Sequence, residues 1–126
     1  MRLLSKPLSV SIERPAPLAY EVLSVPENFP RWTSDWIAEK AEGPVTWCLS
    51  DRNAFGVLDF AVRQSCGRSI YVPLRVVAKG KGCRLVLTLF RRPDMSEEEF
   101  AAAAARAQRD LLAAKGLVET QPVSSL

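Results

Sequence analysis

The order of apolar and polar residues predicts a strand followed by a short helix at the start of the chain. Residues 8–14 alternate strictly between apolar and polar side chains, as in a strand with one buried face. Pro15 ends this strand, and Pro17 is typical of the first turn of a helix, so we expect a helix up to Ser24. Pro26 and Pro30 allow at most one further helical turn before the chain reaches Trp32.

From Trp32 to Arg92 the alternation continues and predicts a series of antiparallel strands separated by turns that contain glycine, proline or asparagine. We expect these strands at residues 36–41, 45–50, 57–63, 70–78 and 83–90. With the first strand they make a sheet of about six strands that has one richly apolar face. Pro73 falls inside the fourth strand of this series, although proline is usual only at edges or bulges.

Near residue 95 the period changes to that of a helix. Ser96 and Glu99 match the capping box, in which each side chain satisfies a free backbone N–H of the other residue. We expect a helix over residues 97–115, with Gly116 as its C-terminal stop. Its inward stripe is mostly alanine, which either brings the helix very close to the sheet or leaves a void between them; it consists of Phe100, Ala103, Ala104, Ala107, Leu111 and Ala114.

The element order and several segments resemble the START-like helix-grip superfamily (SRPBCC, or polyketide cyclase/dehydrase-like proteins). The resemblance is carried by VSIERPAPLAYEVLSVPENFPRW, by FGVLDF and by YVPLRVVAKGKGCRLVLTLFRRPDMSEEEF. It implies an α+β helix-grip fold, in which a curved antiparallel sheet wraps around a long C-terminal helix and two short helices follow the first strand. It also implies a single domain over residues 1–126, with a core at 8–119 and a tail at 120–126.

Composition narrows the chemistry that this chain can perform. The 126 residues, 48% hydrophobic and 25% charged, are ordinary for one globular domain. There is no histidine, which excludes nucleophiles activated by imidazole, histidine metal sites and histidine pH switches. The three cysteines lack close C-x-x-C spacing and are expected to be structural. We therefore expect neither a metal nor a cofactor.

Charge and hydropathy bear on partners and location. The net charge of +3 comes from Lys and Arg residues spread along the whole chain, a distribution that favours an ordinary solvated surface over a nucleic-acid interface. No segment has the roughly 20 apolar residues of a membrane helix, so we expect no membrane insertion. The N-terminus lacks the apolar region of a signal peptide, and we expect a cytoplasmic protein.

In the superfamily that the chain resembles, sheet and helix enclose an apolar cavity that holds hydrophobic compounds. Some members use this cavity as an active site, and others bind client proteins. Carried onto this sequence, the resemblance places the cavity wall at inward-facing strand residues and the underside of the last helix. The candidate ligand-binding residues are Trp36, Trp47, Leu58, Phe60, Leu74, Leu87, Phe100, Ala104 and Ala107.

Four polar residues are candidate anchors for a ligand hydroxyl or carboxylate: Asp59, Arg63, Arg75 and Tyr71. Asp59 and Arg63 lie four positions apart in one expected strand, so their side chains share a face. The alternative is a charge pattern that faces solvent and contributes only a few tenths of a kcal/mol.

The sequence thus favours a protein that binds a hydrophobic or amphipathic small molecule between its sheet and its C-terminal helix. Two alternatives stay open. One is a cyclase or dehydratase-like enzyme that uses the four polar residues for proton transfer and charge stabilisation. The other is a protein-interaction module without a ligand, such as a homodimer. Whether the chain is an enzyme at all is left open at this point.

Overall fold

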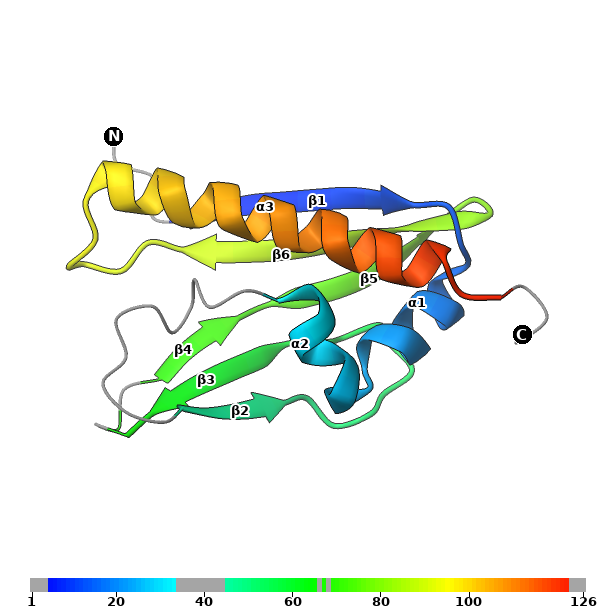
Figure 1. The fold of residues 1–126 in the computed structure, drawn as a ribbon, viewed down its shortest axis with the longest axis horizontal. Coiled ribbons are helices and arrows are strands. Elements are labelled where there is room, and N and C mark those ends of the chain that lie inside the picture. Colours follow the sequence, from blue (N-terminus) through cyan, green and yellow to red (C-terminus); the bar gives the residue numbers. More distant parts are fainter. Residues whose placement is uncertain (1–4, 34–44, 66, 68, 123–126) are drawn as a thin grey trace.

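In the part of the chain that the structure describes, six strands form two three-stranded antiparallel sheets, and a long C-terminal helix lies along one of them (Figure 1). The computed structural model describes residues 5–33, 45–65, 67 and 69–122; the strand expected at 36–41 and part of the tail lie outside them. The elements are β1 (Ser5–Ile12), α1 (Ala16–Leu23), η1 (Pro26–Asn28), α2 (Phe29–Trp32), β2 (Val45–Leu49), β3 (Phe60–Gln64), β4 (Ser69–Val72), β5 (Leu74–Lys79), β6 (Gly82–Phe90) and α3 (Glu97–Glu119).

The strand order is β1-β6-β5 in one sheet and β2-β3-β4 in the other. α3 packs along β1 and also contacts α1 and α2, the short helices that follow the first strand. The α+β helix-grip arrangement expected from the sequence is confirmed. None of the helices in the described part of the chain combines the length and the apolar composition that a bilayer crossing requires.

The single strand expected at residues 70–78 is wrong, because the chain breaks at Pro73 into β4 and β5, which belong to different sheets. Phe60 pairs with Val72, and an isolated bridge joins Val57 to Arg75. Both pairs follow one antiparallel register, which places Asp59 opposite Pro73. In this register Leu58–Leu74 is a hydrogen-bonded pair, so the Pro73 nitrogen faces β6, where Thr88 N–H donates to the Pro73 carbonyl at 3.0 Å and proline can return no bond. Pairing with the residues before Phe60 is interrupted at Leu74, whose N–H binds the Asp59 side chain.

The Asp59 side chain takes part in the connection where the ladder is interrupted. Its Oδ1 accepts a hydrogen bond from the backbone N–H of Leu74 at 2.9 Å. On one side of the break, Leu58 N–H donates to Leu74 O at 2.8 Å. β3 therefore starts at Phe60, later than the expected 57–63 strand, and the residues just before it pair with β5 instead.

The long helix begins where the sequence predicts and ends later. Ser96 Oγ accepts the Glu99 N–H at 3.1 Å, and Glu99 Oε1 accepts the Ser96 N–H at 3.0 Å, which confirms the capping box. The predicted stop at Gly116 is wrong, since the helix continues to Glu119. The continuation buries Val118 completely, at 0% exposure, and the burial of this side chain favours one more helical turn.

The end of α3 is fixed to the segment that follows β1. Glu119 Oε2 accepts the Glu13 N–H at 2.8 Å and pairs with Lys115 Nζ at 2.7 Å. Arg14 Nη2 donates to the Glu119 carbonyl at 2.8 Å. The Glu13 N–H and then the Lys115 ammonium lower the pKa of the Glu119 carboxyl below its ordinary value. These contacts hold the C-terminal turn of the helix against the first sheet.

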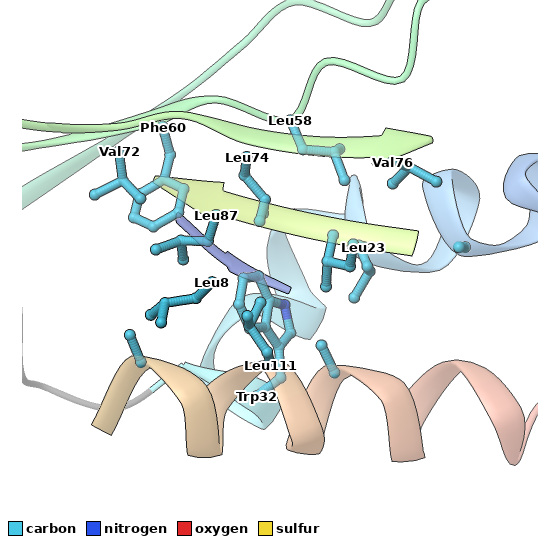
Figure 2. Close-up of a cluster of buried hydrophobic side chains, with 14 of the residues drawn as sticks. Leu8, Leu23, Trp32, Leu58, Phe60, Val72, Leu74, Val76, Leu87 and Leu111 are labelled. Atoms are coloured by element: carbon cyan, nitrogen blue, oxygen red, sulfur yellow. The ribbon is translucent and has the colours of Figure 1, made fainter. Parts of the chain in front are cut away.

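The inward stripe of α3 is confirmed, because all six of its predicted residues are 7% exposed or less. Larger side chains of the strands, among them Leu8, Leu74 and Leu87, fill the space toward the helix together with Trp32 and Leu111 (Figure 2). The alanines thus leave room that leucines of the sheets and the Trp32 indole occupy. The core lies between α3 and the two sheets.

Replacing Leu111 with alanine should lower the free energy of unfolding by about 2–5 kcal/mol, because the side chain is completely buried and a cavity would remain. Leu112, the next residue of the same helix, is 52% exposed, and Leu112→Ala should change stability by no more than about 0.5 kcal/mol. Urea unfolding followed by circular dichroism measures both. Equal losses in the two variants would contradict this orientation of α3.

The substitution Glu119→Gln should destabilise the protein at neutral pH and matter progressively less in acid. A carboxyl whose pKa is lowered by folding stabilises the native state above its unfolded pKa, and the contribution disappears as the pH falls through the folded value. The difference in melting temperature between wild type and variant should therefore shrink between about pH 7 and about pH 3. A difference that stays constant over this range would argue against the ionised Glu119 contacts.

Candidate functional site

A pocket of about 200 Å³ opens between α1, α2 and the end of β2. Its inner surface is apolar: Leu23, Phe29 and Leu58 are between 2% and 7% exposed. Polar side chains lie at its rim. The residues that line it are Tyr20, Leu23, Ser24, Phe29, Leu49, Ser50, Arg52 and Leu58. We call it the inner pocket.

A second pocket, of about 400 Å³, shares Tyr20 and Arg52 with the inner pocket, so these two side chains separate the two spaces. We call it the outer pocket. The Arg52 guanidinium carbon lies 5.5 Å from the centroid of the Tyr20 ring, within cation–π range. Arg52 also pairs with the Glu21 carboxylate. The outer pocket is lined by Ala16, Pro17, Tyr20, Glu21, Arg52, Asn53, Ala54, Phe55, Gly56, Val76 and Ala78.

Asn53 organises the loop that carries Arg52. Its Oδ1 accepts the N–H groups of Phe55 and Val57 at 2.9 and 3.1 Å, and its Nδ2 donates to the carbonyls of Asp51 and Val57. Its own N–H donates to the Tyr20 hydroxyl at 2.8 Å. The loop is thereby tied to α1, which keeps Arg52 close to Tyr20.

A glycine closes the same loop against β5. Gly56 has a φ of +74°, and a Cβ at this position would lie 2.3 Å from the Val76 carbonyl oxygen. A larger residue would have to push the strand away, so glycine is required by both backbone angle and space. Next to it, Phe55 is 85% exposed and forms an outer wall of the outer pocket.

Four aromatic rings meet behind the inner pocket. The Phe29 centroid lies 5.1 Å from Trp32, 5.2 Å from Trp47 and 5.1 Å from Phe60. Trp32 is 3% exposed, and no acceptor among the described residues lies within hydrogen-bonding reach of its buried Nε1. Phe29 was not among the candidate ligand-binding residues predicted from the sequence. The available signal was its position as a large apolar residue between Pro26 and Pro30, in the short helical segment before Trp32.

The structure places the predicted wall residues as follows. Leu58 lines the inner pocket, and Trp47 is 37% exposed within the aromatic cluster. Trp36 lies outside the described residues. The other six belong to the buried core and line neither the inner nor the outer pocket: Phe60, Leu74, Leu87, Phe100, Ala104 and Ala107.

Three of the four predicted polar anchors come together, and one lies apart from them. Asp59 is buried, at 7% exposure; it accepts a hydrogen bond from the Tyr71 hydroxyl and pairs with Arg75. Arg63 is exposed and pairs across the sheet with Thr46 and Ser69 in backbone register, near the far end of β3. With the Leu74 N–H also bound to it, the Asp59 carboxylate is engaged where the two sheets meet.

The cysteine that the structure buries is unsuited to nucleophilic chemistry. Cys83 is 2% exposed, and its burial, followed by the nearby Glu119 carboxylate, raises the pKa of its thiol. A thiol needs to ionise before it can attack or bind a metal. Cys83 therefore acts as a small apolar core residue, as expected from its place in a strand.

Asp59→Asn should lower the free energy of unfolding by about 1–3 kcal/mol, because it removes the charge from a buried group that three partners contact. Asp51 is exposed on the adjacent loop, and Asp51→Asn should be nearly neutral. Thermal unfolding of both variants tests this. A destabilised Asp59→Asn protein supports a structural role for the carboxylate; an unaffected one contradicts it.

No protein-family model and no curated protein matches the sequence. The fold is similar to that of several solved structures. DynU16, from the dynemicin biosynthetic locus, has a TM-score of 0.69 at 14% identity over 94% of this chain and 48% of its own. MLL2253 from Mesorhizobium loti has a TM-score of 0.68 at 11% identity, with 94% and 99% covered. The Zhui aromatase/cyclase from Streptomyces sp. R1128 has a TM-score of 0.52 at 16% identity, with 91% and 93% covered. The chain thus spans about half the length of DynU16.

Proposed function

The chain has the helix-grip fold of START-like proteins, and on this basis we propose that it binds a hydrophobic or amphipathic small molecule. The observation that carries the proposal is the inner pocket, whose floor is buried and apolar and whose rim is polar. A few polar groups around an apolar cavity are the usual composition of a small-molecule site.

The dimensions of the inner pocket limit what it can hold. An apolar cavity of about 150 Å³ is enough to bind benzene, so the 200 Å³ here accommodate one aromatic ring or a short branched chain. Transfer of such a group from water stabilises the complex by about 25 cal/mol for each Å² of apolar surface buried. Leu23 and Leu58 line the pocket and also belong to the cluster between the sheets and α3 (Figure 2).

We propose that a longer ligand reaches from the inner pocket toward the wall residues predicted from the sequence by displacing side chains that fill this cluster. The Trp32 N–H, which has no acceptor among the described residues, supports this path. A buried donor without an acceptor destabilises a protein by about 1–3 kcal/mol, and an oxygen atom of a bound molecule would remove that penalty.

The second candidate is a cyclase or dehydratase-like activity. It is favoured by the shared fold of the Zhui aromatase/cyclase and by the grouping of Asp59, Tyr71 and Arg75. Against it, these three side chains line neither the inner nor the outer pocket, and Tyr71 is 53% exposed. Ligand binding therefore has the stronger support.

Binding is tested with the uncharged, single-ring fluorescent probe 4-(dimethylamino)benzonitrile, whose emission depends on solvent polarity. The wild-type protein should take it up saturably, and Leu49→Trp should weaken binding by about tenfold, since the larger side chain occupies the inner pocket. Leu112→Trp makes the same replacement at an exposed site on α3 and should leave the affinity within about twofold of wild type.

Melting temperatures of both variants establish that each is folded. If the wild-type protein takes up the probe without saturation, or if both variants bind it equally well, the inner pocket is not a ligand site.

A further inference from the structure

The inner pocket carries one charge, and its position suggests which end of a ligand it recognises. Among the described residues that line this pocket, Arg52 is the single charged one. Arg52 lines both the inner pocket, with its apolar floor, and the outer pocket. A group that enters the inner pocket therefore leaves its polar end close to a fixed positive charge.

The contacts of Arg52 hold its guanidinium in place but leave it able to bind a ligand carboxylate. The Tyr20 ring lies beneath it, and Tyr20 is itself 9% exposed and bonded through its hydroxyl to the loop. The partner carboxylate, Glu21, is exposed, with 62% and 56% of the two side chains accessible. Ion pairs this exposed contribute about 0–1 kcal/mol, so another carboxylate can displace Glu21 at little loss.

A guanidinium binds a carboxylate through two parallel N–H···O bonds, a geometry that a ligand can satisfy as well as a side chain can. We propose that the protein selects a carboxylic acid with a small aromatic or short-chain apolar part. The carboxylate takes the place of Glu21 on Arg52, and the apolar part lies on Leu23, Phe29 and Leu58. This inference rests on the proposed function and adds the class of the ligand and the role of one specificity-determining residue.

The proposal predicts opposite effects on acid binding for substitutions of Arg52 and Glu21, the two members of the ion pair. Removing Arg52 removes the counter-ion of the ligand, and removing the charge of Glu21 removes its competitor. Arg52→Gln should therefore weaken the binding of an acid and Glu21→Gln should strengthen it. A neutral ligand of the same shape should respond to neither change.

The experiment uses phenylacetic acid and its uncharged analogue 2-phenylethanol, measured by calorimetry at neutral pH. Wild-type protein should bind the acid more tightly. Arg52→Gln should weaken the acid by about tenfold and Glu21→Gln should tighten it by about threefold, while the alcohol stays within about twofold. Arg84→Gln and Glu27→Gln, at exposed positions that line no described pocket, make the same charge changes and serve as controls.

The outcomes separate the two claims. If wild-type protein binds neither compound, the proposed function fails and the inference with it. If both compounds bind equally and Arg52→Gln changes neither, the pocket binds apolar groups without recognising a carboxylate, and only the inference fails. It fails also if Arg52→Gln weakens both compounds alike, since Arg52 is then only a wall of the pocket.

Discussion

The break in the strand at Pro73 is the constraint on which the architecture depends. A strand that continued through this position would keep residues 69–79 in one sheet, but the Leu74 N–H does not complete the backbone pair with Leu58. The chain instead passes from the second sheet into the first, and the Asp59 carboxylate accepts the N–H of the residue that follows the proline. The two short sheets that result enclose a core with α3, where one flat sheet would cover only a single side.

The pocket is a consequence of the same break. On the far side of Pro73, Gly56 and Leu58 pair with β5 through Val76 N–H and Leu74 O, both at 2.8 Å. This pairing directs the preceding loop toward α1, where Asn53 binds the Tyr20 hydroxyl. Leu58 then lines the inner pocket, and Arg52 lies over Tyr20 at its rim. Different polar residues thus serve the sheet junction and the pocket. Asp59 binds groups of β5 where the sheets meet, and Arg52 lines the inner and outer pockets.

The opposite wall of the core is made by a helix with unusually small inward side chains. Alanine contributes little volume, so the space beside α3 is filled by leucines from the sheets and by the Trp32 indole (Figure 2). Close packing of this kind needs the helix to be held in place. The contact of Glu119 with the Glu13 N–H and that of Lys115 with the Ser11 carbonyl do so at its C-terminal end. Most of the volume of the core is therefore filled by sheet residues and by the aromatic cluster around Phe29 of α2.

The sequence by itself determined the features whose physics is local. The alternation of apolar and polar residues over 8–14 and 83–90 predicted β1 and β6. The capping box at Ser96 and Glu99 predicted the start of α3, and the spacing of its apolar residues by three and four predicted which face is buried. Each of these follows from the backbone geometry of a single strand or helix. The overall fold, in contrast, was implied by the resemblance of the quoted segments to a known superfamily.

Only the tertiary structure decided the features that join distant parts of the chain. Val118 continues the spacing of the buried stripe, but only its burial in the core shows that the helix runs past Gly116, and nothing near Pro73 indicates that Leu74 will bond to Asp59 rather than to a backbone carbonyl. The sequence placed Asp59 and Arg63 on one face of a strand, whereas Asp59 contacts Tyr71 and Arg75 from the neighbouring strands. Among the described residues, η1, α2 and β2 lie between Tyr20 and Arg52, so the contact of these two residues depends on how those elements pack in the core.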